Sequence, residues 1–139
     1  RGGSRYVVID GGTKDIMIKG KYKITNAIDP NGFVYIKSVS FGLRSTGTVI
    51  SSQFHNELTA NNTPIISIQN GFAGDGGVLI SNSMARTLGT DAPTFISVGA
   101  DVMGTICADA HSYGMALISD SGNGTLCADM ASTRNNIKQ

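Results

Sequence analysis

Charged side chains are scarce in this chain of 139 residues. Asp, Glu, Lys and Arg together make up 15% of the sequence, whereas soluble domains typically have about 25%. Charge keeps ordinary monomers soluble and apart. No apolar run is long enough to cross a membrane, and no signal peptide is recognisable, so stable membrane insertion is not expected. The low charge therefore indicates that other copies of the chain cover part of the surface.

Residues that favour helices are also scarce. Glu57 is the only glutamate and there are six lysines, whereas the chain has fifteen Ile, eight Val, twelve Thr and eighteen Gly. β-Branched residues lose rotamer freedom in a helix and pack well on a pleated sheet, while glycine suits turns. The composition predicts an all-β protein.

Positive charge is too sparse to indicate a nucleic-acid partner. The net charge is +1, and basic residues cluster only at Lys14, Lys19, Lys21 and Lys23, with Asp15 among them. Binding of nucleic acid through counterion release needs more positive charge on one face. We interpret the cluster as a solvated strand face and expect no nucleic acid as a partner.

Turn signals follow one another closely and separate short β-like segments. Three Asn-Gly and two Asp-Gly pairs suit turns that need a positive φ. The sequence predicts a jelly roll or β-sandwich of about 8 to 11 short antiparallel strands. Residues 83–88 are the one segment that could instead form a helical turn. The expected strands are 6–9, 15–19, 21–28, 33–41, 48–54, 63–69, 78–82, 94–102, 105–110, 113–119 and 125–130.

The chain has the length of a single domain. A domain of this size buries roughly two thirds of the surface of its unfolded chain, so it needs neither a metal nor a disulfide to fold. The first residue is Arg1 rather than Met, and residues 1–4 (RGGS) are expected to be a linker or tag remnant. Residues 5–139 are expected to form one β-sandwich head domain.

One short internal repeat, which we call the echo, includes both cysteines. Residues 104–109 (GTICAD) recur as residues 124–129 (GTLCAD), but two copies are too few for a solenoid. We interpret the copies as strands on either side of residues 113–119 in a meander, which would place Cys107 and Cys127 roughly 9 to 10 Å apart. This exceeds the reach of a disulfide, so two free, buried thiols and folding in the cytoplasm are expected.

Motifs for catalysis or for metal and cofactor binding are missing from the sequence. His55 and His111 lack the spacing of a zinc site, and no phosphate loop or nucleophile elbow is present. Asp109 and Asp129 hold equivalent positions in the echo and could form the carboxylate pair of a glycan hydrolase. Aspartates at strand ends more often cap turns or face water. We therefore expect no catalytic residue, no metal site, no cofactor and no enzyme activity.

In its low charge and its predicted short β-strands, the chain resembles the heads of viral fibres. Residues 21–26 (KYKITN), 29–36 (DPNGFVYI) and 105–129 are similar to the knob on the tail needle of short-tailed bacteriophages of enteric bacteria. Such knobs resemble trimeric jelly rolls of the tumour-necrosis-factor type (TNF-like) and adenovirus fibre heads. The resemblance implies a virion protein, folded in the bacterial cytoplasm, whose tip meets the host envelope during attachment, penetration and genome delivery.

A head of this kind would be a homotrimer with small residues along its seam. The candidates are Ala108, Ala110, Gly114, Ala116 and Ala128, for which a place in the protomer core is an equal alternative.

Two arginines could bind an anionic group, either a sugar acid of the host envelope or a carboxylate between protomers. They are Arg44 and Arg86, both in loops rich in Gly, Ser and Thr. The alternative functions are a carbohydrate-binding or capsid-decoration module without a tail role and, less in keeping with the sequence, a glycan hydrolase.

Overall fold

The computed structural model describes residues 7–10, 15–25, 34–41, 46–58, 61–69, 78–87, 93–100 and 102–132. Within these residues the chain forms thirteen β-strands and no helix, in agreement with an all-β composition. None of the described residues forms a helix that is long and apolar enough to cross a membrane. The strands are β1 (Val7–Asp10), β2 (Asp15–Ile18), β3 (Lys21–Ile24), β4 (Val34–Phe41), β5 (Thr46–Ile50), β6 (Gln53–Asn56), β7 (Ile66–Ile68), β8 (Val78–Thr87), β9 (Ile96–Val98), β10 (Ile106–Tyr113), β11 (Ile118–Asp120), β12 (Leu126–Ala128) and β13 (Ala131–Ser132).

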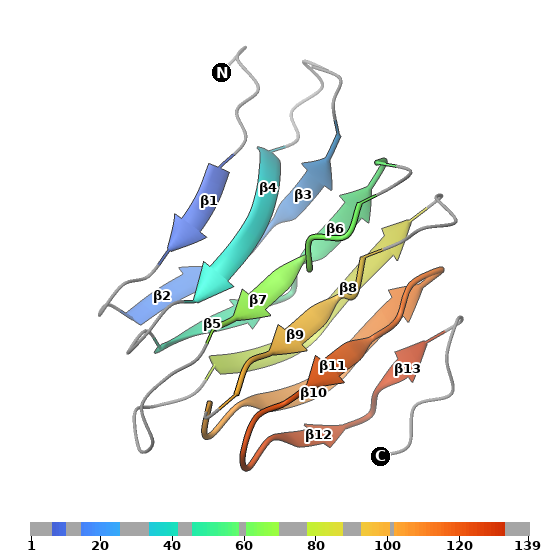
Figure 1. Cartoon of the computed structure of the whole chain (residues 1–139). Coiled ribbons are helices and arrows are strands. Elements are labelled where there is room, and N and C mark those ends of the chain that lie inside the picture. Colours follow the sequence, from blue (N-terminus) through green and yellow to red (C-terminus); the bar gives the residue numbers. More distant parts are fainter. Residues whose placement is uncertain are drawn as a thin grey trace.

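The described residues wind in five successive coils that stack on one another (Figure 1). One sheet contains β1, β4, β7, β9 and β11 in that order, one strand from each coil. The other sheet begins with the row β2, β5, β8, β10 and β12. Its second row is β3, β6, β8, β10 and β13, because β8 and β10 extend through both rows. The first residues of β4 also pair with β3. This winding defines a parallel β-solenoid.

The predicted jelly roll is wrong, because the strand pairs among the described residues are all parallel. The TNF-like arrangement needs antiparallel neighbours joined by hairpins. Here, consecutive strands such as β7 and β8 belong to different sheets, and each strand pairs with its counterpart one coil later. The possible helical turn at residues 83–88 is also wrong over its described part, since β8 continues to Thr87. Residues 1–4 lie outside the described residues.

The echo is the repeat of the solenoid itself. Cys107 in β10 pairs in register with Cys127 in β12, so the two are neighbours rather than two strands apart, and the meander is wrong. Both thiols are free, as expected, but only Cys107 is buried while Cys127 is half-buried, and the expected separation of two strands was wrong. Desolvation by burial raises the pKa of Cys107 most, and the adjacent Cys127 thiol raises it further. Because the thiolate is the reactive form, this pair is held in its inert thiol form.

The core fills the space between the two sheets. Successive residues of a strand point to opposite faces, and most of the buried side chains described are apolar, with Ser52, Asn56, Ser83 and Ser112 among the polar exceptions. In the first sheet the apolar ones include Ile66 and Ile68 in β7 and Ile96 and Val98 in β9, all at most 4% exposed. Phe54 of β6 stacks on Tyr22 of β3 and also contacts Phe95. Stacking of coils therefore builds one continuous core.

A bend divides the second sheet into its two rows. Ser51, Asn82, Asp109 and Asp129 stand at this bend in coils 2 to 5, each with φ between 47° and 54°. The residues just before them, Ile50, Ser81, Ala108 and Ala128, pair with one another in register from coil to coil. The four bend residues therefore also form one column, which we call the corner column. Serine, asparagine and aspartate suit it because short polar side chains tolerate left-handed backbone better than most residues.

Candidate functional site

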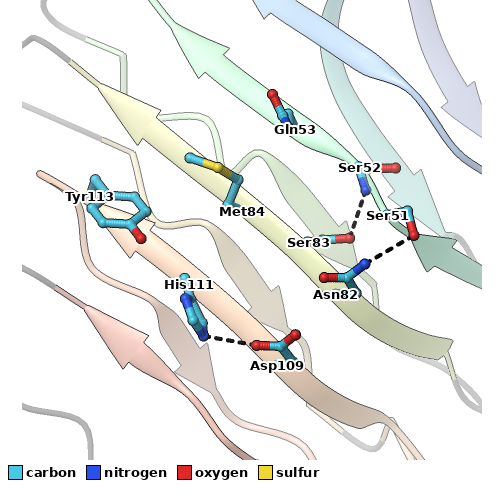
Figure 2. A pocket seen from close by; sticks show the side chains of 9 residues that line it. All are labelled: Ser51, Ser52, Gln53, Asn82, Ser83, Met84, Asp109, His111 and Tyr113. Atoms are coloured by element: carbon cyan, nitrogen blue, oxygen red, sulfur yellow. Dashed lines mark hydrogen bonds and ion pairs between the residues drawn. The ribbon is translucent and has the colours of Figure 1, made fainter.

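A polar groove of about 410 Å³ follows the bend on the outside of the second sheet. Figure 2 shows its side chains on three neighbouring coils, from β5 and β6 across β8 to β10. We call it the corner groove. It is lined by Ser51, Ser52, Gln53, Asn82, Ser83, Met84, Asp109, His111 and Tyr113. The groove exists because equivalent positions of successive coils lie one above another, which aligns their side chains along the stacking direction.

Hydrogen bonds between coils hold the floor of the corner groove. The Asn82 side-chain amide donates to the Ser51 hydroxyl at 3.1 Å. The backbone N–H of Ser52 donates to the Ser83 hydroxyl at 3.1 Å, and that hydroxyl in turn donates to the Ser81 carbonyl at 2.9 Å. Ser52 and Ser83 are buried, at 1% and 4% exposure. These bonds fix the backbone from which the exposed groove side chains project.

Asp109 and His111 form the charged end of the groove. The Asp109 Oδ1 and His111 Nε2 atoms are 3.0 Å apart, and the two side chains are 54% and 37% exposed. Both lie on the outward side of the same chain segment, with Asp109 at the bend of β10 and His111 two positions beyond it. Tyr113 is two positions further along β10 and is 41% exposed. The three side chains thus present a carboxylate, an imidazole and a phenol to solvent in one row.

A second hollow, of about 200 Å³, continues from the corner groove. We call it the basic hollow, since Lys21, His55 and Arg86 line it together with Tyr22 and Phe54. Gln53 and Met84 line both depressions, so the two form one continuous surface. Arg86 and Lys21 supply its fixed positive charge.

His55 is the half-buried group of the basic hollow. Desolvation by burial lowers its pKa most; Arg86 and Lys23 lower it further, against the opposing effect of Glu57. The Nε2 atom of His55 is buried and has no hydrogen-bond partner within the described residues. Because a lowered pKa favours the neutral imidazole, His55 adds no charge to the hollow at neutral pH.

The candidate site residues predicted from the sequence do not lie together in the structure. Arg86 lies in β8 and lines the basic hollow, while Arg44 falls outside the described residues. Ala110 is fully buried in the protomer core. Ala108, Gly114 and Ala116 are half-buried, and Ala128 is exposed. Ala108 and Ala128 pair with each other across β10 and β12.

Most of the groove could not be predicted from the sequence. His111, which was considered only as a zinc ligand, lies within β10, and Asp109 and Asp129 were expected to cap turns or face water rather than to form a catalytic pair. These two aspartates occupy neighbouring places in the corner column. Ser51, Gln53, Asn82 and Tyr113 were not singled out. Within the described part of the chain, no group of three or more His, Cys, Asp or Glu side chains is placed to hold a metal ion.

The fold and the groove define a class of protein: a parallel β-solenoid with an open polar groove along its stacking direction. Comparison with known proteins adds no closer relationship, since no family model, no curated protein and no solved structure matches the chain.

Proposed function

We propose that this chain is a non-enzymatic binding module of a fibre-like surface structure, such as a bacteriophage tail fibre, and that it binds an acidic polysaccharide of the host envelope. The observation on which this rests is the corner groove, which crosses three coils in the stacking direction and continues into the basic hollow. An elongated ligand would contact equivalent positions of successive coils, which is how solenoids form extended binding surfaces.

The openness of the groove favours a polymer over a small molecule. Small-molecule sites are mostly apolar clefts that enclose the ligand. Here the side chains of Asp109 and His111 are about half and more than a third exposed, and the lining is rich in hydroxyl and amide groups. Such a surface can contact one side of a long chain but cannot surround a small ligand.

The chemistry of the lining favours a glycan. Serine hydroxyls, Asn82, Gln53 and Asp109 offer the donors and acceptors that sugar hydroxyls need. Tyr113 presents an apolar ring with a polar hydroxyl at its tip. Such a side chain suits a sugar ring, which has an apolar face and polar hydroxyls on its rim. Among the described residues that line the two depressions, a nucleic-acid backbone would meet the Asp109 carboxylate and two fixed positive charges, Lys21 and Arg86, which is little for binding through counterion release.

The basic hollow indicates the kind of glycan. An arginine guanidinium binds carboxylate and phosphate with two parallel hydrogen bonds, and Arg86 is exposed in β8 with Lys21 lining the same hollow. A polysaccharide bearing a carboxylate or phosphate can place that group near Arg86 while its hydroxyls reach the Asp109 end of the groove.

A binding experiment with the intact chain tests this function. An array of acidic and neutral bacterial polysaccharides identifies a binder, and calorimetry then measures its affinity. Tyr113→Ala and Arg86→Gln are each expected to weaken binding by about tenfold or more, which corresponds to about 1.4 kcal/mol. Binding of the acidic glycan is expected to weaken as salt is raised.

Ser119→Ala is the matched control, because Ser119 is exposed in β11 of the first sheet and lines neither depression; it should leave affinity unchanged. The proposal would be contradicted if the chain bound none of the polysaccharides. It would also be contradicted if Tyr113→Ala and Arg86→Gln both bound as tightly as the unaltered chain. Release of oligosaccharide that Asp109→Asn abolishes would instead establish a hydrolase.

A further inference from the structure

The two cysteines face each other across the last two described coils. Cys107 in β10 pairs in register with Cys127 in β12, and both thiols are free. Residues paired in register on adjacent parallel strands point to the same side of the sheet, and their Cα atoms are about 4.8 Å apart. A disulfide needs Cα atoms that are roughly 4.4–6.8 Å apart. The register therefore places this pair within reach of a disulfide bond.

The column that contains the two cysteines is aliphatic in the earlier coils. Its members pair in register as Ile18, Val49, Ile80, Cys107 and Cys127. The three aliphatic residues are at most 4% exposed and Cys107 is 1% exposed, so each cysteine can fill its place as a small apolar side chain. Two cysteines in adjacent coils also bring two sulfur atoms together. The column therefore packs the core along its whole length and gains a reactive pair where its described part ends.

The two thiols differ in exposure and in acidity. Cys107 is buried, whereas Cys127 is half-buried. Burial raises the pKa of both thiols, but the hydrogen bond between them lowers the pKa of Cys127 and raises that of Cys107 further. Cys127 therefore ionises before Cys107 and is the thiol that a small solute reaches. Because the thiolate is the nucleophile, Cys127 is the attacking sulfur and Cys107 the second one.

We propose that Cys107 and Cys127 are a redox modification site, at which a peroxide forms a disulfide that ties the last described coil to the one before it. The Cys127 thiolate attacks one oxygen of hydrogen peroxide, breaks the O–O bond and becomes a sulfenic acid, and the released hydroxide takes up a proton. The Cys107 sulfur then attacks the Cys127 sulfur, loses its proton and displaces the sulfenic hydroxyl as water. Two thiols and one peroxide thus give one disulfide and two waters, and the oxygens gain the electrons that the sulfurs lose.

The position of β12 allows the bond to close. Among the described residues, β12 pairs with β10 and with no other strand. The Cβ atoms of neighbours in register lie at about the strand spacing of 4.8 Å, slightly more than the roughly 3.5–4.5 Å of a relaxed disulfide. Closure therefore draws β12 slightly towards β10 and leaves some strain in the bond. Because strained disulfides are the more easily reduced ones, a dithiol is expected to reverse the reaction.

The bond would stabilise the end of the described solenoid. A coil inside the stack contacts a coil on either side, whereas β12 has a described partner on one side alone. Strands with few contacts open most readily. Since a disulfide restricts the opened chain, oxidation is expected to slow amide hydrogen exchange in β12 by at least about tenfold. Neither cysteine lines the corner groove or the basic hollow, so this effect goes beyond the proposed function and is tested without a glycan.

Counting the free thiols of the full chain tests the site. The reduced protein is exposed to hydrogen peroxide at mildly alkaline pH, where more of the Cys127 thiol ionises, and is then unfolded and alkylated. Peptide mass spectrometry is expected to show a bridge between Cys107 and Cys127 within one chain and no alkylated cysteine. Dithiothreitol added before alkylation should restore both thiols and the faster exchange of β12. Exchange in β6 of the second coil, which holds no cysteine, should stay the same throughout.

Two alanine variants separate the roles of the two sulfurs. After peroxide, Cys107→Ala is expected to carry a sulfenic acid on Cys127 that dimedone traps, whereas Cys127→Ala should leave the buried Cys107 thiol unmodified. In neither variant should peroxide slow exchange in β12. The inference would be overturned if the oxidised, unaltered chain still had two alkylated cysteines, if the bridge joined two chains, or if exchange in β12 did not change. These three outcomes need the unaltered chain alone, so they decide the matter even if a variant fails to fold.

Discussion

Replacement of Phe54 by alanine is expected to lower the free energy of unfolding by about 3–5 kcal/mol. Phe54 is 1% exposed. Its ring lies 5.2 Å from that of Tyr22 in a stacked arrangement and 5.8 Å from that of Phe95 in a tilted one. Alanine would remove these contacts and leave a cavity that coils fixed by their hydrogen bonds cannot readily close.

Urea unfolding followed by far-ultraviolet circular dichroism measures this effect. Gln53→Ala is the matched control, because Gln53 is the exposed neighbour of Phe54 on the same strand. It is expected to change the free energy of unfolding by no more than about 0.5 kcal/mol. If Phe54→Ala were as stable as Gln53→Ala, the ring could not lie between the coils as described.

The corner column gives the second large effect. At Asn82, with φ of 47°, valine is expected to reduce stability by about 1–2 kcal/mol more than glycine does, because a β-branched side chain clashes in the left-handed region. Asn82→Val and Asn82→Gly both lose the hydrogen bond to Ser51. Their difference therefore isolates the backbone conformation from the lost bond.

Thermal or urea unfolding of the two variants provides the comparison. Leu79→Val and Leu79→Gly are the control pair, because Leu79 points outward within the regular part of β8. There the valine variant should be more stable than the glycine variant, since valine suits a strand better than glycine does. If valine were no worse than glycine at residue 82, the left-handed bend would not be present in solution.

The strand content could be predicted from the sequence, but the direction of pairing could not. Alternation such as that of β3, where Tyr22 and Ile24 point inward and Lys21 and Lys23 outward, is the same for parallel and antiparallel sheets. The period was also hidden, because Asn82 follows Ser51 by 31 residues, Asp109 follows Asn82 by 27, and Asp129 follows Asp109 by 20. Only the last two coils have nearly the same sequence, and that similarity was interpreted as a meander.

The corner groove was hidden for a related reason. Gln53, Met84 and His111 lie far apart in the sequence, and only the register of β6, β8 and β10 brings them into line. Arg86 could be singled out because a lone arginine among small polar residues is conspicuous. A signal was available in the corner column, since Ser51, Asn82, Asp109 and Asp129 are all short polar residues between two apolar-alternating segments.

The central claim is that successive coils pair in parallel and in register, and nuclear Overhauser contacts between the methyl groups of Ala108 and Ala128 test it most directly. These residues face each other across β10 and β12, so their strands should be about 4.8 Å apart. We predict a strong contact between the two methyl groups and another between the side chains of Cys107 and Cys127. Absence of both, with contacts instead between residues 105–110 and residues 113–119 in antiparallel order, would contradict the solenoid.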